Sequence, residues 1–479
     1  MLLEPLFAHA ADQPDEIAVI DDLGSFSFAQ MAAMASGLGS FLARQTDRPH
    51  VGLMLPASAG FVGSFYGTLI ARKAVVPINF LLGDREIAHV IADSGIDTIV
   101  TIPQLAPKLA GRDVKIIDLT RMPPPGDDDE PLPIPSHSPD DLAVLMYTSG
   151  TSGLPKGVRL SYENLQSDVN ASIEKAALQH GHRFLGVIPL FHAFGMTAMM
   201  LAPVQLGTTV VYIARFSPVA AINAFRQHRI SIMFGVPSMF AAIAHLKSAT
   251  ADDFKSAYAL ITGGEPQPAV LRDKFRERFN VELLEGYGLT ETSPVVALNT
   301  PQNHRAGSVG QPLPCVTVKI IDDDGHALPA GQTGEIWLHG PMIMRGYYNL
   351  PAETAAVLTP DRYFKTGDLG HIDEDGYLFI TGRKKDMIIV AGEKAFPREI
   401  EEILNRHETI ADAAVVGKKD PSRGEVVVAF VTAKENQTIQ PDTLRDFCRA
   451  QGLPQWKIPR EITLIDEMPR SPTGKILKR

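Results

Sequence analysis

The segment from Tyr147 to Val158, YTSGTSGLPKGV, has the composition of a phosphate-binding loop. Its glycines let backbone N–H groups approach a polyphosphate, its hydroxyl groups donate hydrogen bonds, and Lys156 supplies positive charge. It is not a Walker A loop, because Gly157 follows the lysine where that motif needs serine or threonine. An ordinary surface turn has a similar composition, so the segment alone leaves both interpretations open. The residues that would hold the phosphates are Thr148, Ser149, Gly150, Thr151, Ser152, Gly153 and Lys156.

Further short segments follow this loop along the chain. Together with the loop they resemble the ordered signatures of the adenylate-forming superfamily, which contains acyl-CoA synthetases, nonribosomal-peptide adenylation domains and luciferases. The resemblance spans essentially the whole chain, and it implies ATP, Mg²⁺ and coenzyme A as cofactors. The segments are PLFHAFG at 189–195, GGEP at 263–266, EGYGLTET at 285–292, GEIWLHGP at 334–341, KTGD at 365–368, TGRKKDMI at 381–388 and PRSPTGK at 469–475.

Within the segment EGYGLTET, the resemblance implies three contacts with the nucleotide. Tyr287 would stack on adenine, Thr290 would hydrogen-bond a phosphate, and Glu291 would bind magnesium through oxygen. A surface turn with incidental polar residues is the alternative interpretation of this segment. The further nucleotide-binding residues that the resemblance implies are Gly264, Glu265, Pro266, Glu285, Gly286 and Gly288.

The second half of the chain carries residues that the resemblance assigns to the ribose and to catalysis. Asp368 and Arg383 match the pair that contacts the ribose in this family. Lys475 matches the lysine that stabilises charge on the phosphoryl oxygens during adenylation. Lys385 matches the hinge, about which the small domain would rotate to bring Gly392 toward a pantetheine thiol. By its composition alone, the stretch around Lys385 is equally well a charged linker.

An aromatic segment, PLFHAFG, matches the border of the acyl channel in this family. His192 in this segment would gate the channel or contact the substrate carboxylate, and a structural histidine is an equal alternative. No Asp or Glu lies in this segment to pair with an α-ammonium group, which disfavours amino acids as substrates. The other expected pocket residues are small or apolar and favour a medium- or long-chain fatty acid, with an aryl acid next: Val236 to Met239, Gly263, Gly264, Pro294 and Val295.

Alternating apolar runs and helical patterns predict an α/β fold with doubly wound parallel sheets in the first part of the chain. Between residues 50 and 101, three strand-like runs enclose two helical patterns, the first of which reaches about Lys73. The same alternation returns downstream, where Ala259 to Thr262 precedes a helix at about 267–279. Residues 122–141 are rich in proline and aspartate, which predicts a connector without regular structure.

The later part of the chain predicts two smaller units. Turn signals after about residue 300 indicate a β-rich subdomain that reaches residue 384. From Lys385 to residue 479, strand and helix patterns alternate again and predict a small, mobile α+β domain. We therefore expect a large adenylation domain at 1–384 and a small C-terminal domain at 385–479.

Composition limits the partners and the compartment. The chain has 479 residues and a net charge of −10, which disfavours binding to nucleic acid. Its two cysteines, Cys315 in a strand-like stretch and Cys448 in a helix-like one, are expected to be reduced thiols. The N-terminus lacks a basic region before its short apolar run, so we expect a cytoplasmic protein. The apolar stretches 61–82 and 196–213 are expected to lie in the core, although peripheral membrane contact stays open.

These observations favour an ATP-dependent acyl-CoA ligase that forms an acyl-AMP with release of pyrophosphate. The alternatives are a ligase that loads an acyl carrier protein, an aryl-CoA ligase, and, from another class, a nucleotide-binding protein without catalysis. Ligases that load carrier proteins often carry an insertion near the hinge, and none is evident at 340–385. Oligomeric state, pathway and the identity of the acid do not follow from the sequence.

Overall fold

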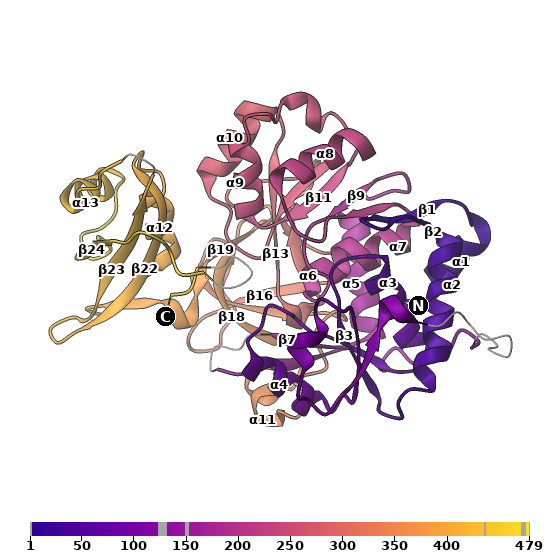
Figure 1. The fold of residues 1–479 in the computed structure, drawn as a ribbon. Coiled ribbons are helices and arrows are strands. Elements are labelled where there is room, and N and C mark those ends of the chain that lie inside the picture. Colours follow the sequence, from indigo (N-terminus) through magenta and orange to yellow (C-terminus); the bar gives the residue numbers. More distant parts are fainter. Residues whose placement is uncertain (1, 123–131, 149–152, 435–436, 471–475, 479) are drawn as a thin grey trace.

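A computed structural model describes residues 2–122, 132–148, 153–434, 437–470 and 476–478. The predicted connector at 122–141 lies partly outside the described residues, and its described part, 132–141, contains no helix or strand. The molecule consists of two α/β layers, whose strands alternate along the chain, followed by a β-rich subdomain and a small domain (Figure 1). The predicted fold class is confirmed.

The first α/β layer is built on a six-stranded sheet in the order β6-β5-β3-β4-β7-β8. Its strands pair in parallel, except that β7 and β8 form an antiparallel hairpin around the glycine-rich loop. The helices α3 (Ala59–Ile70) and α4 (Asp84–Ser94) connect its strands in sequence, as predicted. The strands are β3 (His50–Met54), β4 (Ala74–Pro77), β5 (Thr98–Thr101), β6 (Lys115–Asp118), β7 (Leu142–Thr148) and β8 (Lys156–Ser161).

A nine-stranded sheet forms the second α/β layer, in the order β15-β14-β13-β12-β11-β9-β10-β1-β2. The helices α8 (Pro218–His228), α9 (Pro237–His245) and α10 (Ala269–Phe279) accompany its parallel strands. The strands are β1 (Ile17–Asp21), β2 (Gly24–Ser27), β9 (Phe184–Gly186), β10 (Val210–Tyr212), β11 (Ile232–Gly235), β12 (Ala259–Thr262), β13 (Leu283–Gly288), β14 (Val295–Leu298) and β15 (Gln311–Pro312).

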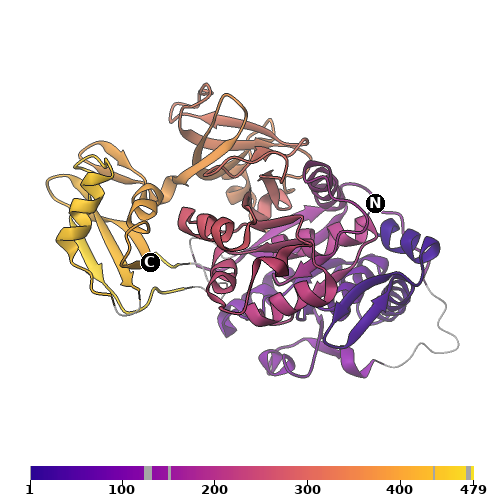
Figure 2. The same ribbon diagram turned by 90° about the horizontal axis from the view of Figure 1, so that it is seen from above.

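Helices between the two sheets bury the most apolar parts of the sequence (Figure 2). Apart from Gly60, every residue of α3 is buried, and the helix packs closely on α2 because both contribute glycines at the contact. The stretches 61–82 and 196–213 are therefore mostly core, as predicted, and none of the described helices is long and apolar enough to cross a membrane. The remaining helices of this region are α1 (Glu4–Asp12), α2 (Phe28–Ala43), α5 (Tyr162–Lys175), α6 (Ala193–Met196), the π-helix η3 (Thr197–Leu201) and α7 (Ala202–Leu206).

The β-rich subdomain is a four-stranded antiparallel sheet with one short helix, α11 (Pro351–Val357). It begins after a turn that contains Cys315, so the strand predicted at this cysteine is wrong. The residues Leu313-Pro314 interrupt the chain before Cys315, and the next strand starts only at Thr317. The strands are β16 (Thr317–Ile321), β17 (Gly334–His339), β18 (Phe364–Ile372) and β19 (Leu378–Arg383).

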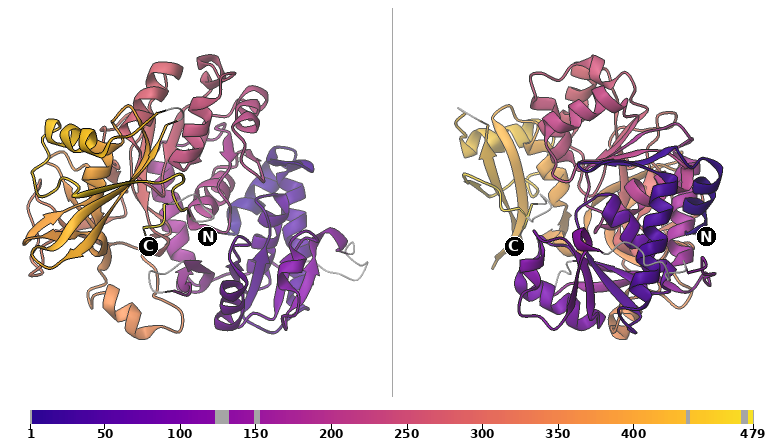
Figure 3. Two further views of the ribbon diagram at one scale, coloured as in Figure 1. Left: turned by 60° about the vertical axis from the view of Figure 1, so that its left-hand side comes forward. Right: turned by 45° about the vertical axis from the view of Figure 1, so that its right-hand side comes forward.

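The small domain has its own sheet and its own core, which includes Ile400, Val431 and Cys448. Figure 3 shows it beside the β-rich subdomain, on the far side of the molecule from the N-terminus. Both cysteines are free, and burial raises the pKa of each thiol to about 11, as expected for reduced structural residues. The elements are β20 (Ile388–Val390), β21 (Glu393–Ala395), α12 (Pro397–Leu404), β22 (Ile410–Asp420), β23 (Gly424–Ala433), α13 (Pro441–Ala450) and β24 (Glu461–Leu464).

Candidate active site

The predicted ribose-binding residues Asp368 and Arg383 lie side by side, because β18 and β19 pair with these two residues in register. The Arg383 Nε is 3.1 Å from the Asp368 Oδ1. Tyr287 Oη donates a hydrogen bond of 2.6 Å to the other carboxylate oxygen. Gly367 precedes the aspartate with a φ of +71°, a conformation that glycine adopts without strain. The carboxylate is thus fixed from two sides before any ligand binds.

Tyr287 remains a phenol in this environment. Burial, together with the nearby Asp368 carboxylate, raises the pKa of Tyr287 well above its usual value. The hydroxyl group therefore keeps its proton and acts as a donor to Asp368. This contact was not predicted from the sequence, which indicated only that the aromatic ring could stack on adenine.

A second cluster joins the glycine-rich loop to the predicted magnesium ligand. Glu291 lies in the short 3₁₀-helix η5 (Thr290–Thr292), and its Oε1 accepts a hydrogen bond of 2.8 Å from Tyr347 Oη. The Lys156 Nζ lies 5.2 Å from the centre of the same tyrosine ring. Tyr347 thus links two predicted phosphate-side residues. Sequence reasoning missed it, because it lies in a loop without a periodic pattern.

The cluster around Glu291 suits a hard divalent cation. Tyr347 engages one carboxylate oxygen, and an ionised carboxylate has further lone pairs on both oxygens. Oxygen donors of this kind are the ligands that Mg²⁺ prefers. The residues present therefore fit the predicted magnesium ion.

The hairpin β7-β8 positions the glycine-rich loop. Thr148 at the end of β7 pairs with Lys156 at the start of β8, so the two residues flank the loop at its base. Gly153 is exposed and has a φ of +129°. The predicted phosphate ligands Ser149, Gly150, Thr151 and Ser152 lie outside the described residues. The structure therefore places only the two ends of the predicted phosphate loop.

An apolar cavity lies next to the ribose-binding residues and shares Tyr287 with them. Small residues form part of its wall: a Cβ atom added to Gly263 would come within 3.1 Å of the Phe194 ring. Among the described residues, none that lines the cavity carries a charge. The predicted pocket residues Gly263, Gly264, Pro294 and Val295 all line it, whereas Val236 to Met239 do not belong to the lining.

His192 precedes α6 between two aromatic residues and is partly buried. Burial lowers the pKa of its imidazole to about 4, so the ring is neutral at physiological pH. Its Nε2 atom is buried and has no hydrogen-bond partner in the described structure. The Phe191 ring lies 4.8 Å from the imidazole. A neutral imidazole with an unused nitrogen can accept or donate one hydrogen bond to a substrate.

Glu285 connects the large domain to the small domain. Its Oε1 accepts a hydrogen bond of 3.2 Å from the Gln267 backbone and lies 3.6 Å from Arg398 of α12. Burial raises the pKa of Glu285 to about 7, against the opposing effect of Arg398. The side chain thus serves a contact between domains. Arg398 was not predicted from the sequence, since a single arginine at the start of a helix is usually a solvated charge.

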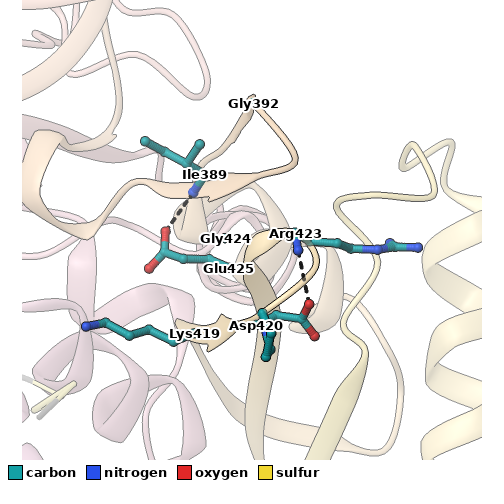
Figure 4. A pocket seen from close by; sticks show the side chains of 8 residues that line it. Ile389, Gly392, Lys419, Asp420, Arg423, Gly424 and Glu425 are labelled. Atoms are coloured by element: carbon teal, nitrogen blue, oxygen red, sulfur yellow. Dashed lines mark hydrogen bonds between the residues drawn. The ribbon is translucent and has the colours of Figure 1, made fainter.

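Two other predicted residues lie on the small-domain side of this contact. Lys385 belongs to the short 3₁₀-helix η6 (Lys384–Asp386) between β19 and β20. Gly392 lies in the exposed turn between β20 and β21 and borders a surface pocket with Lys419 and Arg423 (Figure 4). Gly392 is therefore not part of the apolar cavity in this arrangement. Lys475 lies outside the described residues.

Asp368, the hairpin β7-β8 and the apolar cavity meet around Tyr287 and η5. Because β8 contacts η5, the base of the loop lies close to the end of β13 that borders the cavity. An apolar acid in the cavity would present its carboxylate to the phosphates of a nucleotide. That geometry is expected of an enzyme that activates acids with a nucleoside triphosphate.

Comparison with known proteins gives the same class of enzyme, one that activates acids with a nucleoside triphosphate. The chain matches the family model for the AMP-binding enzyme at residues 6–348 and the model for the AMP-binding enzyme C-terminal domain at 399–475. The chain belongs to this adenylate-forming family and is an AMP-forming acid–thiol ligase. The predicted family and enzyme class are thereby confirmed.

Individual relatives are similar over nearly their whole length. The chain is 32% identical to a long-chain-fatty-acid–CoA ligase of Bacillus subtilis strain 168, with 98% of this chain and 92% of that protein covered. It is 34% identical to a feruloyl-CoA synthase of an Amycolatopsis species, with 94% and 91% covered. ATP-bound MatB from Rhodopseudomonas palustris superposes with a TM-score of 0.91 at 26% identity, over 100% of this chain and 97% of that chain.

Proposed function

We propose that the protein joins a carboxylic acid to AMP and then transfers its acyl group, which is uncharged and largely apolar, to coenzyme A. The observation that carries this proposal is the apolar cavity that shares Tyr287 with the ribose-binding Asp368. A medium- or long-chain fatty acid suits the lining, and an aryl acid suits it as well. The names of the two relatives, one a fatty-acid ligase and one a feruloyl-CoA synthase, support both classes.

In the first half-reaction, a carboxylate oxygen of the acid attacks the α-phosphorus of ATP and the bond to the β-phosphate oxygen breaks. Pyrophosphate leaves, and the product is a mixed anhydride of the acid and AMP. Asp368 and Arg383 would hold the ribose, while Thr290 and Lys156 would contact phosphate oxygens. A magnesium ion bound by Glu291 would neutralise charge on the departing pyrophosphate.

The roles of Lys475 and His192 complete this step. A lysine side chain placed at the α-phosphate stabilises the charge that grows on its oxygens in the transition state more than it stabilises bound ATP. Neutral His192 would hydrogen-bond the substrate carboxylate or its acyl oxygen, since its Nε2 has no partner in the described structure. Removal of water by the apolar wall would strengthen both interactions.

In the second half-reaction, the thiol of coenzyme A attacks the acyl carbon, the bond to the phosphate oxygen breaks and AMP leaves. Gly392 lies on an exposed turn here, so the small domain would have to rotate about Lys385 to bring that turn to the cavity. The contact between Arg398 and Glu285 would break in that movement. One site would thus carry out two reactions in sequence.

Acid-dependent ATP–pyrophosphate exchange, measured across fatty, aryl and amino acids, tests this proposal. Hits are then supplied with coenzyme A and assayed for thioester. We expect exchange with fatty or aryl acids, thioester formation with free coenzyme A, and no exchange with amino acids. Exchange without thioester would indicate a carrier protein as acceptor, and absence of exchange with every acid would favour the nucleotide-binding protein without catalysis.

A further inference from the structure

The acyl cavity is apolar except for a few hydroxyl groups, and these differ in their hydrogen bonding. Thr197 Oγ1 donates to the Ser293 carbonyl at 2.8 Å, and Thr262 Oγ1 donates to the Leu284 carbonyl at 3.0 Å. Tyr287 donates to Asp368, as described above. Ser172 is the remaining hydroxyl-bearing residue among the described residues of the lining, and its buried Oγ has no partner among them.

Ser172 lies on α5, and a second buried polar group lies one turn earlier on the same face. Residues four apart on a helix are neighbours, so Asp168 is adjacent to Ser172. Asp168 is fully buried: its Oδ1 accepts a hydrogen bond of 3.1 Å from the Val295 backbone, and its Oδ2 has no partner in the described structure. This face of α5 therefore presents polar atoms toward β14 and η3, which form other walls of the cavity.

Polar atoms left without partners in a protein interior are uncommon, because each loses its hydrogen bonds with water. A comparable hydroxyl group on α5 has a hydrogen-bond partner within the helix: Ser167 Oγ donates to the Asn164 carbonyl at 3.1 Å. Ser172 lies on the same helix, but its Oγ makes no such bond to any of the described residues. A ligand in the cavity would supply the missing partner.

We propose that Ser172 determines specificity by hydrogen-bonding an uncharged polar substituent of the acid, a hydroxyl or oxo group remote from the reacting carboxylate. This inference rests on the proposed function. A hydroxyl side chain both donates and accepts, so it matches either substituent. A charged substituent does not fit, because no charged residue in the described part of the chain lines the cavity to pair with it.

The position of Ser172 along the cavity agrees with a polar substituent that is remote from the carboxylate of the acid. Gly263 and Gly264 follow the end of β12 that faces the nucleotide, whereas Ala176, one turn beyond Ser172, accepts a hydrogen bond from Tyr258 just before β12 begins. The wall of α5 thus runs from the nucleotide toward the other end of the cavity, and Ser172 lies within this path.

Pairs of acids that differ by one hydroxyl group test the inference through ATP–pyrophosphate exchange. The pairs are 4-hydroxycinnamic and cinnamic acid, and 12-hydroxydodecanoic and dodecanoic acid. We expect the wild type to prefer the hydroxylated member of one pair about tenfold in kcat/KM, as one neutral hydrogen bond would give. The pair that shows the preference identifies the carbon skeleton as aryl or aliphatic.

Ser172→Ala should abolish that preference by lowering kcat/KM for the hydroxylated acid alone. Ser167→Ala on the same helix is the matched control and should leave the ratio unchanged. Exchange with plain acids, combined with no preference in either pair or with equal losses for both members in Ser172→Ala, would overturn the inference and leave the proposed function intact. Absence of exchange with every acid would overturn both.

Discussion

On the nucleotide side of the site two carboxylates, those of Asp368 and Glu291, are each held by neighbouring side chains, whereas on the acyl side two polar atoms have no partner among the described residues. Asp368 is held by Tyr287 and Arg383, and Glu291 is held by Tyr347. In contrast, the buried Oγ of Ser172 and Nε2 of His192 have no hydrogen bonds in the described structure. Protein groups thus orient Asp368 and Glu291 on the nucleotide side, whereas on the proposed function a substrate would complete the acyl side.

This difference predicts two classes of variant. Changes on the nucleotide side should lower activity by the same factor for every acid, because ATP is common to all reactions. Changes on the acyl side should alter the ratio between acids. A substitution on the nucleotide side that changes the order of preferred acids would contradict this difference between the two sides of the site.

The largest effect is expected for Lys475→Ala. Removal of a charge that acts on the transition state should lower the rate of adenylate formation by about 10²–10³-fold. Thioester formation from a supplied acyl adenylate should fall far less, since the proposed rotation would bring another face of the small domain to the cavity in that step. Single-turnover assays of the two half-reactions measure this split.

Lys478→Ala is the matched control, because Lys478 Nζ lies 2.6 Å from Glu401 within the small domain. It should leave both half-reactions near wild-type rates. Equal losses in both half-reactions of Lys475→Ala would contradict rotation of the small domain.

The next largest effect is expected for Asp368→Asn. The change keeps the shape of the side chain but removes the charge that pairs with Arg383 and, on the proposed function, would accept from the ribose hydroxyl groups. Hydrogen bonds to charged groups contribute about 1.5–3 kcal/mol each, so kcat/KM for ATP should fall about a hundredfold or more. Initial rates at varied ATP concentration, with each acid in turn, give this value.

Asp361→Asn serves as the control for this substitution. The Asp361 carboxylate is exposed and accepts a hydrogen bond of 2.6 Å from Thr359, outside the site. Its kcat/KM should match the wild type. A similar loss in the two variants would show that Asp368 acts through folding instead of through ribose binding.

A smaller effect is expected for Tyr347→Phe. Loss of the hydroxyl group removes a donor from Glu291 and leaves the ring beside Lys156 in place. We expect about a tenfold increase in the magnesium concentration needed for half-maximal activity, because the carboxylate is less well oriented. Tyr363→Phe, in the β-rich subdomain, should leave the magnesium titration unchanged.

The smallest effect concerns Glu285 and appears in stability. Its pKa is about 7 in the fold against 4.5 ordinarily, so the folded protein binds the extra proton between these values. The contribution of Glu285 to stability is therefore fully present below pH 4.5 and is lost as pH rises through 7. Glu285→Gln stays neutral and lacks this loss.

Thermal unfolding at pH 5 and pH 8 measures the effect. The Tm of Glu285→Gln relative to wild type should rise by a few degrees between the two pH values. Glu277→Gln, at an exposed position on α10, should show no such change. An unchanged difference for Glu285→Gln would mean that its carboxyl titrates in the fold as it does in the unfolded chain.

Much of the fold could be predicted, because apolar runs and helical periods report burial directly. The strand at Ala259–Thr262 has the predicted bounds. The helix predicted to reach Lys73 ends at Ile70 instead, because Arg72 adopts a φ of +57° in a turn before β4. Such a turn is set by how the helix returns to the sheet, and a local pattern does not reveal it.

The candidate site, like the fold, contains residues that could be predicted from the sequence and residues that could not. Residues within recognisable segments, such as Asp368 and Arg383, lie side by side as the resemblance implied. Tyr347 and Arg398 were missed, because each acts on a residue far away in sequence and neither has a distinctive neighbourhood. Ser172 was missed for another reason. Its Oγ is buried without a hydrogen-bond partner among the described residues, and burial of this kind can be recognised only in the packed structure.

The most direct test of the account follows oxygen atoms through the reaction. An acid labelled with ¹⁸O in its carboxylate is incubated with ATP, magnesium and coenzyme A, and the nucleotide product is analysed by mass spectrometry. Attack by the carboxylate on the α-phosphorus, followed by thiol attack on carbon, predicts one ¹⁸O atom in AMP and none in pyrophosphate. Label in inorganic phosphate with formation of ADP, or AMP without label, would contradict an acyl-adenylate intermediate.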